Sequence, residues 1–153
     1  DWSSDVCSSD LNKRFYGNPA LKIKQRKSTL VAVDTSGSVG KDDLREFLSE
    51  IHHIWKTGTE VTVIECDAKI GRVYEYKGKI EESKQVTGRG GTSYEPVMKY
   101  LWDHKDKYQN LIYLTDGECS IEETKPCKPV LWVHCSGRSI NHELPGAKVQ
   151  ITK

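Results

Sequence analysis

Apolar positions follow two patterns along the chain, and these predict strands and helices in alternation. Short apolar runs rich in β-branched residues are typical of strands buried on both faces of a sheet. Apolar residues that recur every three or four positions predict a helix with one buried stripe. We expect strands at residues 29–34, 60–66, 72–76, 111–115, 130–135 and 147–151, and helices at residues 41–56 and from residue 92 onward.

The order of these elements predicts an α/β fold with a mostly parallel sheet. The strand at residues 72–76 follows residues 60–66 too closely for a helical crossover, so we expect it to be antiparallel and to lie at a sheet edge. The second helix is expected to begin with a capping box, because Thr92 and Glu95 have the required spacing. Its apolar stripe is expected at Val97, Tyr100, Leu101 and Trp102.

The composition changes this picture little. The chain has 153 residues, 36% of them hydrophobic and 29% charged, with 23 Lys and Arg against 22 Asp and Glu. These proportions suit one ordinary globular domain and exclude collagen-like, coiled-coil and disordered chains. The longest unbroken apolar runs have four residues, far fewer than the roughly 20 that a membrane-spanning helix needs. We therefore expect no membrane partner.

The first 27 residues differ in character from the rest. Residues 1–11 have the sequence D-W-S-S-D-V-C-S-S-D-L, which matches the in-frame translation of a common sequencing adapter, so we interpret them as an artefact. Without their three acids the net charge rises from +1 to +4. Residues 12–27 contain six bases and no acid, which favours a linker from a missing upstream domain. Phe15 and Tyr16 leave a nucleic-acid-binding arm as the weaker alternative.

Outside the adapter-like segment the chain has four cysteines, Cys66, Cys119, Cys127 and Cys135, and no two of them form a C-x-x-C pair. A structural zinc site usually brings its ligands two to four residues apart. Buried, reduced thiols in a cytoplasmic protein are therefore the better interpretation of these residues.

Hydroxyl and carboxylate side chains are expected to gather at one edge of the predicted sheet. Open α/β sheets bind ligands beyond the carboxyl ends of their strands. All the residues concerned are hard oxygen donors of the kind that Mg²⁺ or another hard divalent cation prefers. Each short motif alone is also typical of an ordinary turn or helix cap, so the prediction of a metal site depends on their joint order. The residues are Asp34, Ser36, Ser38, Thr92 and Asp116.

The same residues carry a resemblance to a known family. D-T-S-G-S at residues 34–38, G-G-T at residues 90–92 and T-D-G at residues 115–117 resemble the metal-ion-dependent adhesion site (MIDAS) of a von Willebrand factor A (VWA) domain. The resemblance covers most of residues 28–153 and implies a Rossmann-like, doubly wound sheet. More narrowly, V-A-V-D-T-S-G-S-V, V-T-V-I-E-C-D-A and G-R-G-G-T resemble the bacterial VWA-like domain that follows a metallopeptidase-like domain.

The resemblance implies how such a site works. Ser36, Ser38 and Thr92 would contact Mg²⁺, Mn²⁺ or Ca²⁺ directly, whereas Asp34 and Asp116 would hold the ion directly or through water. An acidic side chain of a protein partner would take the sixth position. Genes of this family commonly lie beside one for a MoxR-type AAA+ ATPase, which makes such an ATPase the implied partner. We expect a metal-dependent protein-binding domain without catalytic residues.

Enzymatic alternatives fit the sequence less well. A metal-dependent hydrolase or phosphatase of the haloacid dehalogenase type needs a second Asp two residues after the first, where this chain has Ser36. A nucleophile at Ser36 or Ser38, with His134 as its base, lacks the G-x-S-x-G elbow. No H-E-x-x-H motif of a zinc protease occurs, so a role in a metallopeptidase would be an accessory one. A scaffold whose site holds no ion is a further alternative.

Overall fold

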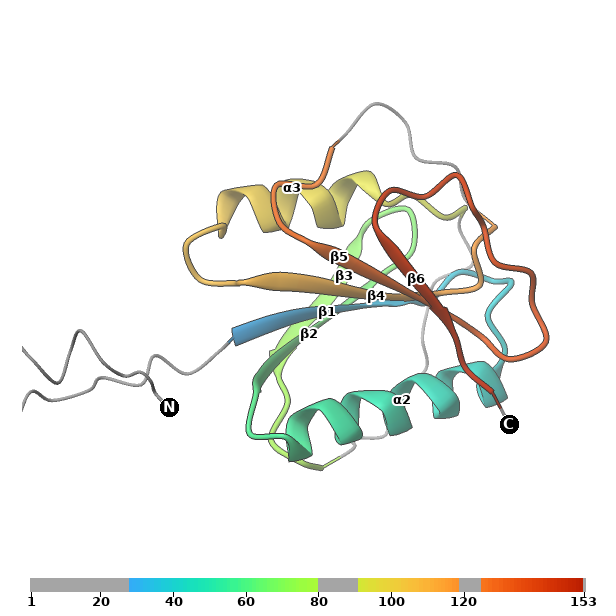
Figure 1. Cartoon of the computed structure of the whole chain (residues 1–153), viewed down its shortest axis with the longest axis horizontal. Helices are drawn as coiled ribbons and strands as arrows, with labels where there is room; N and C mark the ends of the chain where they lie inside the picture. The colour runs from blue at the N-terminus through green and yellow to red at the C-terminus, as the bar shows by residue number, and fades with distance from the viewer. Residues whose placement is uncertain (1–27, 80–90, 119–124, 153) are drawn as a thin grey trace, which may run out of the picture.

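The computed structural model describes residues 28–79, 91–118 and 125–152. Within these ranges six strands form one sheet, and one helix lies on each face of it (Figure 1). Each element lies close to the range predicted from the sequence. The strands are β1 (Ser28–Asp34), β2 (Glu60–Cys66), β3 (Ile70–Glu75), β4 (Asn110–Thr115), β5 (Val130–His134) and β6 (Ala147–Gln150), and the helices are α2 (Lys41–Lys56) and α3 (Glu95–Asp103).

The strands of the sheet have the order β3-β2-β1-β4-β5-β6. Every neighbouring pair is parallel except β2 and β3, which are antiparallel. The predicted α/β fold, with a mostly parallel sheet and one antiparallel edge strand, is therefore confirmed.

The strand order creates a topological switch point between β1 and β4. The chain leaves β1 through α2 toward β2 and β3, and it returns through α3 to β4 on the other side of β1. The two helices lie on opposite faces of the sheet (Figure 1). The strands that follow β1 directly therefore lie on one side of it, and β4 and the later strands lie on the other. Open α/β sheets bind ligands at such a point.

The central strand β1 is buried on both faces, and all seven of its residues are buried. Leu30 and Ala32 belong to an apolar cluster that includes residues of α3, whereas Val31 and Val33 belong to a second cluster that includes residues of α2. Successive side chains of a strand point to opposite faces, so the unbroken apolar run serves both layers of the core. This strand carries Asp34 at its carboxyl end.

Helix α2 spans the predicted residues and begins soon after the turn that follows β1. At its N-cap, the Gly40 amide donates a hydrogen bond of 3.0 Å to Asp43 Oδ2. Asp42 and Asp43 in the first turn also complement the positive end of the helix dipole. Beyond Lys56, Gly58 has a φ of 85°, a left-handed conformation that commonly ends helices.

Helix α3 begins at Glu95, and the predicted capping box of Thr92 and Glu95 is wrong. Tyr94 is the N-cap and makes no side-chain capping hydrogen bond. The Met98 amide donates the hydrogen bond back to Tyr94 O, at 3.1 Å. A helix capped at Thr92 would need an amide hydrogen on the fourth residue after the cap, and that residue is Pro96, which has none.

The predicted apolar stripe of α3 is confirmed only in part. Val97 and Leu101 are fully buried, whereas Trp102 is 57% exposed. Consecutive residues of a helix point about 100° apart, so Trp102 does not share the buried face of Leu101. Its ring lies instead beside Lys105, whose Nζ is 5.3 Å from the ring centroid.

Some predictions concern residues outside the described ranges and stay predictions: the adapter-like residues 1–11, the linker at residues 12–27, the glycines before residue 91 and Cys119. Of the described cysteines, Cys66 and Cys135 are buried and Cys127 is partly buried, and all three are free thiols. Burial raises the pKa of Cys66 and of Cys135 to about 12. In the part of the chain that is described, no helix combines the length and apolar character needed to cross a bilayer.

Candidate metal site

Asp34 ends β1 and is fully buried. Its Oδ1 accepts a hydrogen bond from the Ser36 amide, and its Oδ2 accepts one from Thr115 Oγ1, each at 2.9 Å. Burial raises the pKa of Asp34, and the negative charge of Asp116 adds to the rise, while hydrogen bonds from Ser36 and Thr115 oppose it. Both carboxylate oxygens therefore have protein partners, and Asp34 joins the turn after β1 to the end of β4.

The turn after β1 brings two hydroxyls together. Ser36 Oγ lies 3.1 Å from Ser38 Oγ. Thr35 fixes the turn against β2, because its amide and its hydroxyl both donate to Cys66 O, at 2.8 and 3.1 Å. Two adjacent ligands of an octahedral Mg²⁺ with bonds of about 2.1 Å would lie about 3.0 Å apart. The spacing of the serine hydroxyls therefore fits this ion.

Asp116 follows β4 and differs from Asp34 in its hydrogen bonds. It is 3% exposed, and its Oδ1 accepts a hydrogen bond of 3.2 Å from the Glu118 amide. Its Oδ2 is buried and has no hydrogen-bond partner among the described residues. Buried polar atoms in folded proteins nearly always have a partner. A cation beside Oδ2 would supply the missing interaction.

Thr115 links the two aspartates to the segment that precedes α3. Its single hydroxyl hydrogen is donated to Asp34, so the Gly117 amide and the Tyr94 hydroxyl, each 3.1 Å away, donate to Thr115 Oγ1 in turn. The Ser93 amide donates to Asp67 O at 3.1 Å. These two contacts hold the residues directly after Thr92 at the same edge of the sheet as Asp34.

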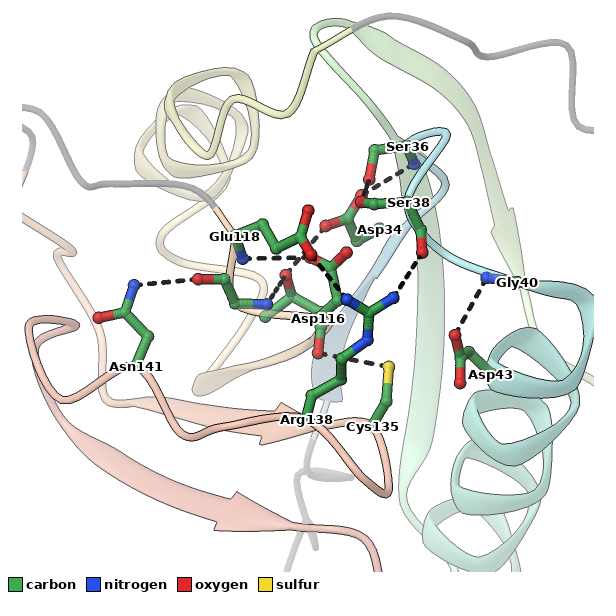
Figure 2. Close-up of polar contacts among 12 residues, drawn as sticks. Asp34, Ser36, Ser38, Gly40, Asp43, Asp116, Glu118, Cys135, Arg138 and Asn141 are labelled. Atoms are coloured by element: carbon green, nitrogen blue, oxygen red, sulfur yellow. Dashed lines mark hydrogen bonds and ion pairs between the residues drawn. The ribbon is translucent and has the colours of Figure 1, made fainter.

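Arg138 bridges the turns after β1 and β4. Its Nη2 donates to Ser38 O at 3.1 Å, and its Nη1 lies 2.6 Å from Glu118 Oε1. The carbonyl of Arg138 accepts a hydrogen bond from Gln150 Nε2, which ties this segment to β6. Figure 2 shows the guanidinium between Asp116 and Ser38. Sequence reasoning missed Arg138, because it lies 100 residues from Ser38 and belongs to no motif.

His134 packs against the turn after β4. It is fully buried, and its Nε2 accepts a hydrogen bond of 3.3 Å from the Asn141 amide. Burial lowers the pKa of His134, so the ring is held neutral. Gly117 adopts a φ of 82°, and a Cβ there would lie 2.8 Å from His134 Cδ2. Only glycine fits this close approach.

The structure brings four of the five predicted ligands into one cluster. Asp34, Ser36, Ser38 and Asp116 lie together at the carboxyl ends of β1 and β4 (Figure 2). For Thr92, the structure shows that the next two residues, Ser93 and Tyr94, are held at the same edge of the sheet. In the described ranges, no group of three or more His, Cys, Asp and Glu side chains is suited to a metal. A metal site here would therefore depend on hydroxyl oxygens beside two carboxylates, which suits a hard cation such as Mg²⁺.

The serine hydroxyls do not form a nucleophile pair with histidine. Ser36 Oγ and Ser38 Oγ contact each other, and the contacts of His134 described above are with backbone groups. The geometry of the described residues therefore lacks the hydrogen bond between nucleophile and base that serine hydrolases use.

The strand order and the polar cluster at the switch point place the chain among the doubly wound α/β domains. A family model described as VWA-like domain (DUF2201) matches residues 29–152. The chain belongs to this family.

Two individual proteins are also similar to the chain. An uncharacterized protein of Thermotoga maritima is 23% identical over 111 residues, which are 72% of this chain and 28% of that protein. The crystal structure of the ArnB paralog VWA2 from Sulfolobus acidocaldarius superposes with a TM-score of 0.54 and 20% identity, covering 71% of this chain and 34% of that one. The chain thus spans about a third or less of either protein, and the second similarity shows the shared fold.

Proposed function

We propose that this domain binds a divalent cation at the Asp34–Asp116 cluster and, through the cation, an acidic side chain of a protein partner. The observation that carries the proposal is the buried Oδ2 of Asp116, which has no hydrogen-bond partner among the described residues. The turn after β1, with its pair of hydroxyls on Ser36 and Ser38, belongs to the same cluster (Figure 2). A buried carboxylate oxygen without a partner is costly to the folded state. A bound cation would remove that cost.

The candidate ligands favour an anionic partner. Ser36, Ser38 and Thr92 are neutral, and both oxygens of Asp34 already accept hydrogen bonds. A cation held mainly by neutral hydroxyls keeps much of its positive charge and supplies strong electrostatic attraction for a carboxylate at an open coordination position. Mg²⁺ is the proposed ion, and Mn²⁺ and Ca²⁺ are the alternatives.

The partner and the role of the whole protein extend the proposal beyond the domain. Because the chain spans 28% of its Thermotoga maritima relative, the domain would act as one module of a longer protein. By the family resemblance, an upstream metallopeptidase-like domain and a MoxR-type AAA+ ATPase partner are the proposals that follow. In both proposals the domain binds a partner and does not catalyse a reaction. The hydrolase alternative is not supported by the described contacts, because the serine hydroxyls contact each other and His134 Nε2 accepts from the Asn141 amide.

Direct metal binding tests the proposal. Mn²⁺ is titrated into the chain, and the free ion is measured by electron paramagnetic resonance. We expect a single Mn²⁺ site, which Mg²⁺ displaces and which Asp116→Ala abolishes. Asp103→Ala is the matched control, because Asp103 is exposed at the far end of α3 and should keep wild-type binding. No Mn²⁺ binding by the wild type, or equal binding by Asp116→Ala, would contradict the proposal.

A further inference from the structure

The contacts of Arg138 place its positively charged guanidinium next to the proposed metal site. Its guanidinium contacts Ser38 O in the turn after β1 and the Glu118 carboxylate in the turn after β4. These two turns also present the candidate ligands Ser38 and Asp116, and the Glu118 amide donates to Asp116 Oδ1. The guanidinium therefore lies between the two turns from which a metal would be held (Figure 2).

The Arg138–Glu118 ion pair is exposed, so another carboxylate can take the place of Glu118. The Arg138 side chain is 40% exposed and the Glu118 side chain 51% exposed. Exposed ion pairs contribute little to stability, with a median of about 0 to 1 kcal/mol, so another carboxylate can replace Glu118 at low cost. A guanidinium carries five N–H donors in a planar fork that matches a carboxylate. Arg138 can therefore hold an incoming carboxylate while it keeps its contact with Ser38 O.

We propose that Arg138 is a second receptor for the partner's acidic side chain, and that Glu118 occupies this receptor in the free domain. A carboxylate has two oxygens, so one can bind the cation while the other accepts a hydrogen bond from Arg138. This inference rests on the proposed metal-dependent function. It adds that the partner must displace Glu118, and that Arg138 selects a carboxylate over a neutral ligand.

A purely structural role for the pair predicts a different result from a receptor role. If Arg138 and Glu118 only hold the two turns together, Arg138→Gln and Glu118→Gln break the same contact and change partner binding in the same direction. If Arg138 receives the partner and Glu118 competes with it, the two substitutions change binding in opposite directions. The sign of the two effects therefore separates the roles.

The probe is a fluorescein-labelled hexaglutamate peptide, and its binding to the full chain is measured by fluorescence anisotropy in Mn²⁺ and in EDTA. We expect Arg138→Gln to weaken Mn²⁺-dependent binding by about tenfold, because a charge-assisted hydrogen bond is lost. Glu118→Gln is expected to tighten it about threefold, because the internal competitor is removed. Arg45→Gln, which removes the same charge from an arginine whose side chain is 80% exposed on α2, should bind as the wild type does.

Mn²⁺ binding is measured in the same variants, so that the inference and the proposed function can fail separately. Wild-type Mn²⁺ affinity in Arg138→Gln together with unchanged peptide binding would overturn the receptor role and keep the metal site. Shifts of both variants in the same direction would overturn it too, as would absence of Mn²⁺-dependent peptide binding by both the wild type and Glu118→Gln. Absence of Mn²⁺ binding by the wild type would instead overturn the proposed function.

Discussion

The turns after β1 and β4 each place an aspartate at the switch point, but the two residues have different surroundings. Asp34 has protein donors on both carboxylate oxygens, one from its own turn and one from Thr115. Asp116 has a donor on Oδ1 alone, and its buried Oδ2 has no partner among the described residues. Neither side chain is more than 3% exposed.

This difference separates two tasks within one cluster. Asp34 connects the turn after β1 to β4, and through Thr115 it also connects to Tyr94 ahead of α3. Asp116 leaves an oxygen that none of the described residues uses. We infer that Asp34 mainly maintains the shape of the site and that Asp116 mainly serves the ligand.

The largest effect on stability is expected from Asp34→Ala. The substitution leaves the Thr115 hydroxyl and the Ser36 amide without their acceptor, and hydrogen bonds to charged groups contribute about 1.5 to 3 kcal/mol each. The free energy of unfolding in EDTA, measured by urea denaturation, should fall by about 2 to 4 kcal/mol. Asp34→Asn keeps one acceptor oxygen and should lose less than Asp34→Ala. Equal stability of Asp34→Ala and wild type would contradict this role.

Gly117→Ala is expected to have the next largest effect. The new Cβ would lie 2.8 Å from His134 Cδ2, at a φ of 82°, so the turn must shift. Backbone strain of this kind costs about 1 to 3 kcal/mol. Gly137 is the matched control, because its φ is 78° and a Cβ added there would meet nothing within 4 Å. Thermal unfolding should show a larger loss for Gly117→Ala than for Gly137→Ala, and equal losses would contradict the close contact with His134.

A smaller effect is expected from pH. Burial lowers the pKa of His134 below its ordinary value of 6.5. As the pH falls below 6.5, His134 takes up a proton in the unfolded chain but stays neutral in the folded protein. The free energy of unfolding is therefore highest above pH 6.5 and falls as the pH approaches the lower pKa that His134 has in the folded protein. His134→Gln should flatten the fall in unfolding free energy between about pH 7 and pH 5. An unchanged slope would contradict this account.

The smallest effect on stability is expected from Asp116→Ala in EDTA. The substitution removes one hydrogen bond from the Glu118 amide, but it also removes a buried carboxylate oxygen to which no described residue donates. These two changes oppose each other, so the free energy of unfolding should differ from wild type by less than about 1 kcal/mol. A loss as large as that of Asp34→Ala would mean that both aspartates are structural.

Local patterns predicted much of the fold and part of the site. The apolar run of β1 and the helical spacing of α2 depend on neighbouring residues, and the structure follows both. Asp34, Ser36 and Ser38 share one turn, so their proximity is a property of a short segment. The switch point then brings Asp116 to the same edge, because parallel strands end together.

Features that depend on distant contacts were not visible in the sequence. The Tyr94–Thr115 hydrogen bond and the Arg138 bridge join residues far apart in the chain, and no spacing rule connects them. The capping box failed for a local reason, since Pro96 prevents a helix from beginning at Thr92. That no described residue donates to Oδ2 of Asp116 becomes visible only when the hydrogen bonds of the structure are known.

The most direct test of the account compares the thermal unfolding of wild type and Asp116→Ala with and without metal. A ligand at a hundred times its dissociation constant stabilises the folded state by about 2.7 kcal/mol, which raises Tm by several degrees. We predict that Mg²⁺ or Mn²⁺ raises the Tm of the wild type and leaves that of Asp116→Ala at its value in EDTA. No rise in the wild type, or an equal rise in both proteins, would contradict the claim that Oδ2 of Asp116 serves a metal ion.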